Sequence, residues 1–315
     1  MIGERTIDGF VALTLASEDL EAAFVPSVGM VGCSLRHRGV ELLGQREGLT
    51  AYASAGGTMG IPLLHPWANR LDRTRFRVAD HEVVLDRDSP RLSLDPNGLP
   101  IHGLLAAARG WQVERHEATV DRAVLEASFD FGAEDELTAA FPFAHRILFE
   151  ATLSANTLTI ATMVSASGDS AVPISFGYHP YLHLPEVGRD QWEVEIPVRE
   201  HLEVDRLMLP TGRRDALEIA SGALGSRTLD DGFVAPPAAA PFVLAGGGRR
   251  IELSVGKGYP FVQVYAPEDD DVIAYEPMTA PTNALVVGGP DLPLVAPGNE
   301  YRATFSIAVA SDATK

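Results

Sequence analysis

Cysteine is nearly absent from the sequence: Cys33 is the single one among 315 residues. One thiol excludes an internal disulfide framework and any metal cluster held by several thiolates. Nothing in the cysteine content therefore requires an oxidising compartment. We expect Cys33 to be a small buried apolar residue, since no basic partner that would make it a nucleophile is evident.

Basic residues are also scarce. The 25 Lys and Arg stand against 43 Asp and Glu, a formal net charge of −18. Because no stretch gathers enough cations to offset this field, nucleic acid and anionic membranes are not expected partners. No window approaches about 18 uninterrupted apolar residues, and charges at Glu4, Arg5 and Asp8 occupy the place of a signal-peptide core. We expect a cytoplasmic protein.

Several enzyme signatures are missing as well. The sequence has no Gly-x-x-x-x-Gly-Lys-Ser/Thr loop, no Gly-x-Gly-x-x-Gly after a strand and no Gly-x-Ser-x-Gly elbow. These motifs hold nucleotide phosphates or expose a serine nucleophile. Nucleotide cofactors and serine-hydrolase chemistry therefore lose support.

Apolar and polar residues alternate with period two in residues 124–131, 146–154 and 301–309, which is typical of half-buried strands. The 29 Gly and 22 Pro would interrupt long helices, and only residues 134–140 offer a short helical pattern. Residues 235–241 indicate a surface loop rather than a linker. The sequence predicts an all-β protein, an antiparallel sandwich or barrel, with residues 1–315 in a single domain.

Glu276 is conspicuous because it lies within the apolar run Val-Ile-Ala-Tyr-Glu-Pro-Met. Burial would raise the pKa of this carboxyl toward the range in which it exchanges protons near neutrality. The alternative is a structural ion pair between Glu276 and a buried Arg.

Two histidines, His179 and His183, lie among aromatic residues in the segment Ser-Phe-Gly-Tyr-His-Pro-Tyr-Leu-His. Their spacing also suits two metal ligands on a helix, but Pro180 opposes a helix and no Glu follows, so no metal is expected. Either imidazole is alternatively a hydrogen-bonded packing residue.

Asn69 and Arg70 follow a segment rich in proline and carry amide and guanidinium groups that hydrogen-bond sugar hydroxyls. His102 precedes Gly103 at a turn. Each of these pieces is nonspecific by itself, and Arg70 is equally explained as a residue that caps a loop.

Taken in order, five segments resemble the aldose 1-epimerase (galactose mutarotase-like) family. They are Pro66-Trp67-Ala68-Asn69-Arg70, His102-Gly103, Tyr178-His179-Pro180-Tyr181, Asp230-Asp231-Gly232-Phe233 and Glu276-Pro277-Met278-Thr279-Ala280-Pro281. The resemblance spans nearly the whole chain, and its strongest part continues through Asn283, Ala284 and Leu285.

This resemblance implies a large antiparallel β-sandwich, the galactose mutarotase-like supersandwich, whose cleft holds a monosaccharide. Glu276 matches the catalytic base and His179 the catalytic acid. The residues that match the family's sugar-positioning groups are Asn69, Arg70, His102 and Asp230. Asp231 is an equal candidate to Asp230. The implied reaction exchanges α and β anomers by ring opening and closure, with no cofactor or metal. Trp67 or Tyr181 would stack on the sugar or pack in the core.

Three other activities stay open. Galactose mutarotases often carry Asn and Thr where this chain has Ser175, Phe176 and Gly177, so galactose is not established as the sugar. A hexose-6-phosphate 1-epimerase would need cations, for which Arg70, Arg73 and Arg75 are available. A noncatalytic carbohydrate-binding protein would use the same cleft. A lyase or hydrolase has less support, because glycosidases need two carboxylates and only one convincing candidate is present.

Overall fold

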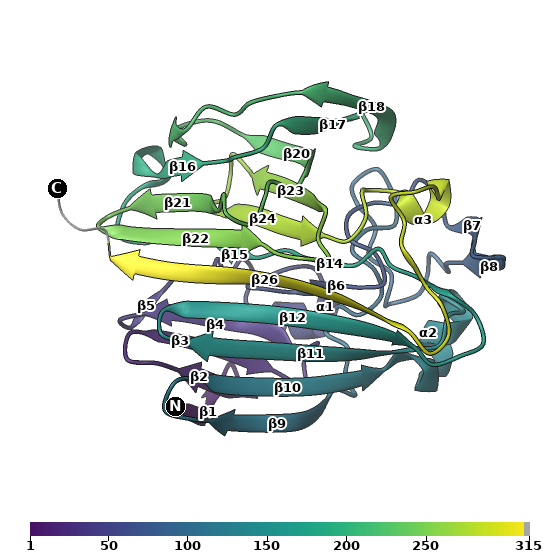
Figure 1. Ribbon diagram of the computed structural model, residues 1–315, viewed down its shortest axis with the longest axis horizontal. Helices are drawn as coiled ribbons and strands as arrows, with labels where there is room; N and C mark the ends of the chain where they lie inside the picture. Colours follow the sequence, from purple (N-terminus) through teal and green to yellow (C-terminus); the bar gives the residue numbers. More distant parts are fainter. Residues whose placement is uncertain (312–315) are drawn as a thin grey trace.

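The computed structural model describes residues 1–311, which form three large antiparallel sheets (Figure 1). The largest has nine strands. In spatial order they are β19 (Gly222–Ala223), β16 (Glu193–Glu195), β21 (Phe242–Gly246), β22 (Arg249–Val255), β26 (Glu300–Ser311), β12 (Thr157–Ala166), β11 (His145–Ser154), β10 (Ala123–Asp130) and β9 (Gln112–Ala118).

The second sheet carries most of the candidate site. Its order is β18 (Pro210–Ala216), β17 (Glu200–Val204), β20 (Leu229–Val234), β23 (Phe261–Ala266), β24 (Ile273–Met278), β14 (Gly177–Tyr178) and β6 (Leu63–Leu64), with β15 (Tyr181–Leu182) also paired to β24. The third sheet runs in chain order through β1 (Ile2–Ile7), β2 (Phe10–Ala16), β3 (Leu20–Val25), β4 (Val31–His37) and β5 (Val40–Glu41).

Small elements complete the described residues. Two further pairs are β7 (Arg75–Val78) with β8 (His81–Val84), and β13 (Val172–Pro173) with β25 (Leu294–Val295). The helices are short: α1 (Leu49–Ala55), α2 (Asp135–Ala140), α3 (Ala284–Val287), and single 3₁₀ turns at Phe131–Ala133 and Arg189–Gln191.

The nine-stranded sheet packs against both other sheets, which makes the fold a sandwich. Phe149 of β11 meets Phe24 of β3 edge to face, with ring centroids 5.3 Å apart. At the other end, Phe242 of β21 packs on Tyr275 of β24 at 4.9 Å. One continuous apolar cluster reaches from Leu13 to Val309.

Strand β26 lies in the middle of the nine-stranded sheet, between β22 and β12 (Figure 1). It pairs with β22 from Val255 to Arg249 and with β12 from Ser165 to Thr157. The last described strand therefore joins the two halves of this sheet.

The predicted elements are present. The patterns at 124–131, 146–154 and 301–309 are β10, β11 and β26, with their expected core sides buried or nearly so. The helical pattern at 134–140 is α2, and residues 235–241 form a loop between β20 and β21. Cys33 is buried on β4, and burial raises the pKa of its thiol to about 12, which fits a packing role.

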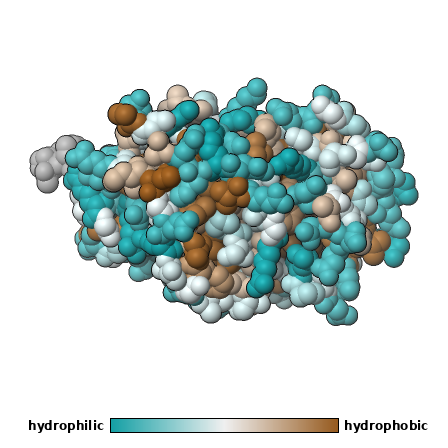
Figure 2. All heavy atoms as spheres, turned by 90° about the horizontal axis from the view of Figure 1, so that it is seen from below, coloured by the Kyte–Doolittle hydropathy of each residue, from teal (hydrophilic) through white to brown (hydrophobic). Residues whose placement is uncertain are grey.

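The outer face seen from below is largely hydrophilic, with apolar side chains gathered near its centre (Figure 2). The exposed large apolar residues of the described chain include Val11, Val113 and Val287. No helix within residues 1–311 is both long and apolar enough to cross a membrane.

Candidate active site

Glu276 lies in the middle of β24 on a face of the eight-stranded sheet shared with other polar residues. The register pairs Gln263 with Glu276 and Gly232 with Gln263. Because side chains alternate along each strand, Asp230 and Tyr265, two residues away, point to this same face. Val264 and Tyr275 point the other way and are fully buried in the core.

His179 meets Glu276 at this face. The segment between β14 and β15 carries His179, whose backbone N–H donates to the Pro62 carbonyl. Its Nε2 lies 3.1 Å from Oε1 of Glu276, and the two residues are 5% and 2% exposed. The structure thus brings together the two residues predicted as acid and base, from segments almost 100 positions apart.

The second polar atom of each partner is unsatisfied. His179 Nδ1 and Glu276 Oε2 are buried and have no hydrogen-bond partner among residues 1–311. Unpaired buried polar atoms are costly, on the order of 1–3 kcal/mol each, so each one in a native fold calls for an explanation. Here both atoms belong to the predicted acid and base.

Burial shifts the pKa values of Glu276 and His179 in opposite directions. Desolvation, with Asp230 nearby, raises the pKa of Glu276 well above its usual value. Desolvation, together with His102 and Arg46, lowers the pKa of His179 well below its usual value. Burial therefore drives both partners toward their uncharged forms.

His102 borders His179, and Asn69 lies beside His102 in an adjoining loop. Both have left-handed backbone, with φ of 58° and 62°, a conformation that Asn and His tolerate better than most residues. The Asn69 N–H donates to Nδ1 of His102 over 3.3 Å, while the His102 N–H donates to the Asn69 carbonyl over 3.1 Å. This pairing leaves Nε2 of His102 as the ring atom that carries hydrogen.

Gly103 locks the His102 loop in place. Its φ is +77°, and a Cβ there would lie 2.2 Å from the His65 carbonyl oxygen. That carbonyl accepts the N–H groups of Leu104 and Leu105. The ring of His102 comes to rest with its centroid 5.7 Å from that of His179.

Arg70 is held beside this loop by Asp95. Its Nε donates to Asp95 Oδ2 over 2.9 Å and its Nη1 to Asn69 Oδ1 over 3.0 Å. The Asp95 side chain is 1% exposed and also accepts two backbone N–H groups of its turn. Arg70 is 15% exposed and lowers the pKa of His102, after the larger effect of burial.

Strand alternation places Asp230 and Asp231 on opposite faces of the sheet. Asp230 is on the Glu276 face and accepts a hydrogen bond of 2.7 Å from Nε2 of Gln263. Asp231 points to the opposite face, where its Oδ1 lies 3.1 Å from Nε2 of His201. Desolvation raises the pKa of Asp230.

Two other candidates, Trp67 and His183, make their contacts elsewhere in the fold. Trp67 is completely buried, so its ring is core packing and presents no face to a sugar. His183 donates from Nδ1 to the Asp271 carbonyl and lies apart from the Glu276 contact. Within residues 1–311 no group of three or more His, Cys, Asp or Glu is placed to hold a metal ion.

The sequence interpretation missed four residues at the site: Arg46, Asp95, Gln263 and Tyr265. Gln263 and Tyr265 occupy the polar phase of the alternating run Phe-Val-Gln-Val-Tyr, a signal that precedes the Glu276 strand directly. Asp95 begins the Asp-Pro-Asn-Gly turn. A pocket of about 420 Å³ reaches the candidate site at His102 and is also lined by Thr58 and Leu64.

The sandwich is the galactose mutarotase-like fold, which several solved structures share. A galactose mutarotase-like protein from Clostridium acetobutylicum is 20% identical, with a TM-score of 0.86 over 99% of this chain and 98% of that chain. Galactose 1-epimerase from Lactobacillus acidophilus is 14% identical, with a TM-score of 0.75 over 99% and 98%.

The family follows from the sequence match. The model of the family described as aldose 1-epimerase matches residues 12–308. The chain therefore belongs to the aldose 1-epimerase family. No curated protein sequence matches it significantly.

Proposed function

We propose that this chain is an aldose 1-epimerase, an isomerase that interconverts the α and β anomers of a monosaccharide. The contact between His179 Nε2 and Glu276 Oε1 carries the proposal, because two groups this close together could act as acid and base on one anomeric centre. Family membership supplies the reaction class. Asn69, Arg70, His102 and Asp230 position the sugar.

The reaction needs only proton transfers. Glu276 removes the proton of the anomeric hydroxyl while His179 protonates the ring oxygen, and the ring opens to an aldehyde. Rotation about the first carbon–carbon bond lets the ring close on the other face, with the two roles exchanged. The proton count is unchanged, so we propose that no redox cofactor or metal takes part.

Sugar binding would also set the starting protonation state. In the sugar-free pair, burial favours the carboxylic acid and the neutral imidazole. Hydroxyl groups that donate to the unsatisfied Oε2 of Glu276 would stabilise its carboxylate and shift the shared proton to His179. The ligand thereby converts the pair into the base and acid that ring opening requires.

The distribution of charge favours an unphosphorylated sugar over a hexose 6-phosphate. Phosphate recognition uses free cations, whereas Arg70 is already paired with Asp95 and Arg46 with Asp270. The other Arg candidates, Arg73 and Arg75, are 60% and 66% exposed and are paired with Asp72 and Glu82.

Anomer exchange followed by polarimetry or exchange NMR tests the proposal on free and phosphorylated aldoses. Glu276→Gln and His179→Ala should each slow exchange about 10²- to 10⁴-fold. His201→Ala is the matched control, because His201 makes a contact of the same length with Asp231 on the opposite face of the sheet.

Unchanged rates in folded Glu276→Gln and His179→Ala proteins would refute the assignment. Sugar binding without exchange in the wild type would instead identify a noncatalytic carbohydrate-binding protein. Exchange confined to phosphorylated aldoses would identify a hexose-6-phosphate 1-epimerase.

A further inference from the structure

Arg46 lies over the aromatic residue that stacks on His179. Its guanidinium carbon is 5.0 Å from the ring centroid of Tyr181. The Tyr181 ring is itself stacked on the His179 imidazole, with centroids 4.1 Å apart and planes inclined by 15°. The Arg46 guanidinium therefore lies over the Tyr181 ring, which in turn stacks on the His179 imidazole.

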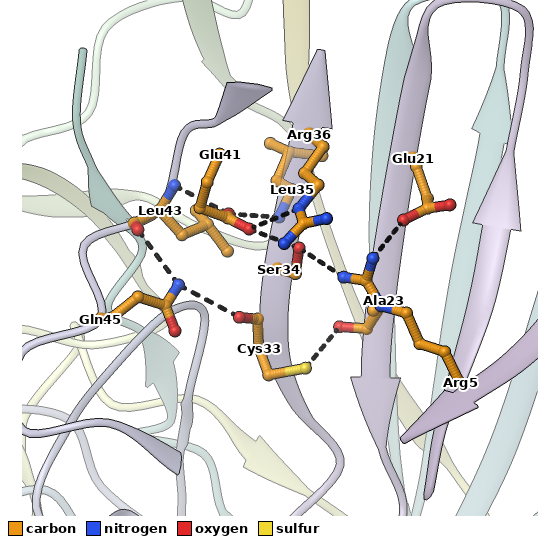
Figure 3. Close-up of polar contacts among 10 residues, drawn as sticks. All are labelled: Arg5, Glu21, Ala23, Cys33, Ser34, Leu35, Arg36, Glu41, Leu43 and Gln45. Carbon is orange, nitrogen blue, oxygen red and sulfur yellow. Dashed lines mark hydrogen bonds and ion pairs between the residues drawn. The ribbon is translucent and has the colours of Figure 1, made fainter. Parts of the chain in front are cut away.

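The backbone around Arg46 is fixed to neighbouring strands. Arg46 has a left-handed φ of 48°, an uncommon conformation for a long side chain that the surrounding contacts must maintain. Next to it, Gln45 donates from Nε2 to the carbonyls of Cys33 and Leu43 (Figure 3). The Gly44 N–H donates to the Tyr181 carbonyl over 2.9 Å, so the loop carrying Arg46 is tied directly to β15.

Both ends of this arrangement are held by side chains. Arg46 pairs with Asp270, with Nη1 3.3 Å from Oδ2, and both side chains are about one-third exposed. The Tyr181 hydroxyl hydrogen-bonds Oγ1 of Thr58. Tyr265 contacts His179 and Tyr181 edge to face. The Tyr181 ring is therefore confined on several sides, and His179 with it.

We propose that Arg46 is a positioning residue that acts on His179 through Tyr181. Its guanidinium keeps the Tyr181–His179 stack aligned with Glu276 and opposes a positive charge on His179 in the sugar-free protein. The catalytic consequence rests on the proposed function, whereas the effect on His179 does not.

The charge of Arg46 has a clear use in such a pair. An imidazolium and a carboxylate at this distance attract each other, and a sugar would have to break their ion pair before it could engage either group. A nearby guanidinium makes that ion pair less favourable and leaves both groups available.

The groups that face His179 come from several elements: Glu276 on β24, Tyr265 on β23, Tyr181 on β15, His102 in its loop, and Arg46 with Asp270 behind it.

NMR titration of the imidazole of His179, assigned with His179→Gln, tests the inference without reference to turnover. Replacing Arg46 by Gln should raise the pH at which the imidazole takes up its proton by about one unit, since a like charge is removed. Arg46→Lys keeps the charge and should titrate near the wild type. Circular dichroism confirms that each variant is folded.

Arg38→Gln is the matched control. Arg38 also has a left-handed φ, 52°, and pairs with an aspartate, Asp19, but it lies between β4 and β5 and away from His179. Its loss should leave the titration unchanged. The inference is overturned if Arg46→Gln titrates like the wild type, if neither protein protonates His179 over the folded range, or if Arg46→Lys behaves like Arg46→Gln.

Turnover of α-D-glucose and α-D-galactose supplies the second measurement. Arg46→Gln should lower kcat about tenfold with a smaller change in KM, because the bound sugar meets a misaligned acid. The acid limb of its pH profile should move to higher pH along with the imidazole. A profile that stays in place while kcat falls would show a merely structural role. A wild type inactive on every aldose would refute the proposed function, while the NMR titration would still decide how Arg46 acts on His179.

Discussion

Arg70 and Asp95 form a largely buried pair in which the aspartate holds the guanidinium beside the His102 loop, with Nε 2.9 Å from Oδ2. The carboxylate is also tied to its own turn by the N–H groups of Asn97 and Leu99. Arg70 is therefore positioned by a residue that need not itself touch a ligand.

Replacement of Asp95 by Asn should impair sugar binding. The amide preserves an oxygen for the turn but loses the charge that orients Arg70, so we expect KM to rise about tenfold with a smaller change in kcat. Asp86→Asn is the control, because Asp86 accepts a backbone N–H in an exposed turn. Initial rates over a range of aldose concentrations separate the two parameters, and equal KM values would contradict the positioning role.

The two neighbouring aspartates on β20 should behave differently. Asp230→Asn removes a carboxylate from the Glu276 face and should lower kcat/KM by about ten- to a hundredfold. Asp231→Asn changes only the contact with His201 on the other face, and its kcat/KM should stay within about twofold of the wild type. Equal losses in the two variants would show that strand alternation does not decide which acid serves the cleft.

Acid should destabilise the protein through buried neutral imidazoles. His145 donates from Nδ1 to the Phe143 carbonyl, and its Nε2 lies 2.7 Å from Nε2 of His65. Burial lowers the pKa of His145 from its ordinary 6.5 to about 4. Between these values the unfolded chain binds a proton that the folded protein does not, so stability falls as pH decreases from about 6.5 to about 4.

Urea unfolding at pH 7 and pH 5 measures this effect. The contribution of His145 to the loss should be about 2 kcal/mol. A His145→Gln variant should be less stable at pH 7 but should lose about that much less on acidification. If the variant and the wild type lose equal amounts, His145 does not carry the pH dependence.

Two glycines with similar backbone conformation should lose different amounts of unfolding free energy when each is replaced by Ala. Gly103→Ala combines a positive φ with a clash against the His65 carbonyl, so we expect a loss of more than about 3 kcal/mol and displacement of His102. Gly39→Ala, with φ of +81° and nothing near its Cβ position, should lose only about 1 kcal/mol. Urea unfolding measures both, and anomer exchange should fall in Gly103→Ala alone. A similar small loss in both would contradict the clash.

The long strands were predictable because each has one face in the core. In β10, β11 and β26 the apolar period of two is uninterrupted, and the core residues lie where alternation places them. Strands β6, β14 and β15 have two residues each and no period to detect. Their position depends on partners distant in the sequence, and they lie around His179. The expectation that residues 1–315 form one domain stays a prediction.

The site was partly predictable. The local sequence and the family resemblance single out Glu276 and His179 as candidates, but their contact requires the pairing of β14 with β24. Asp230 was indistinguishable from Asp231 until the register with β23 was known. Arg46 carried no local signal, because its proximity to His179 arises from the tie between its loop and β15.

The central place of β26 has a consequence for synthesis of the chain. Until residues 300–311 leave the ribosome, β12 and β22 each present an unpaired edge. Such edges recruit strands from other molecules. We therefore expect the nascent chain to be prone to aggregation until β26 is inserted, and we expect a chain truncated before Glu300 to remain so.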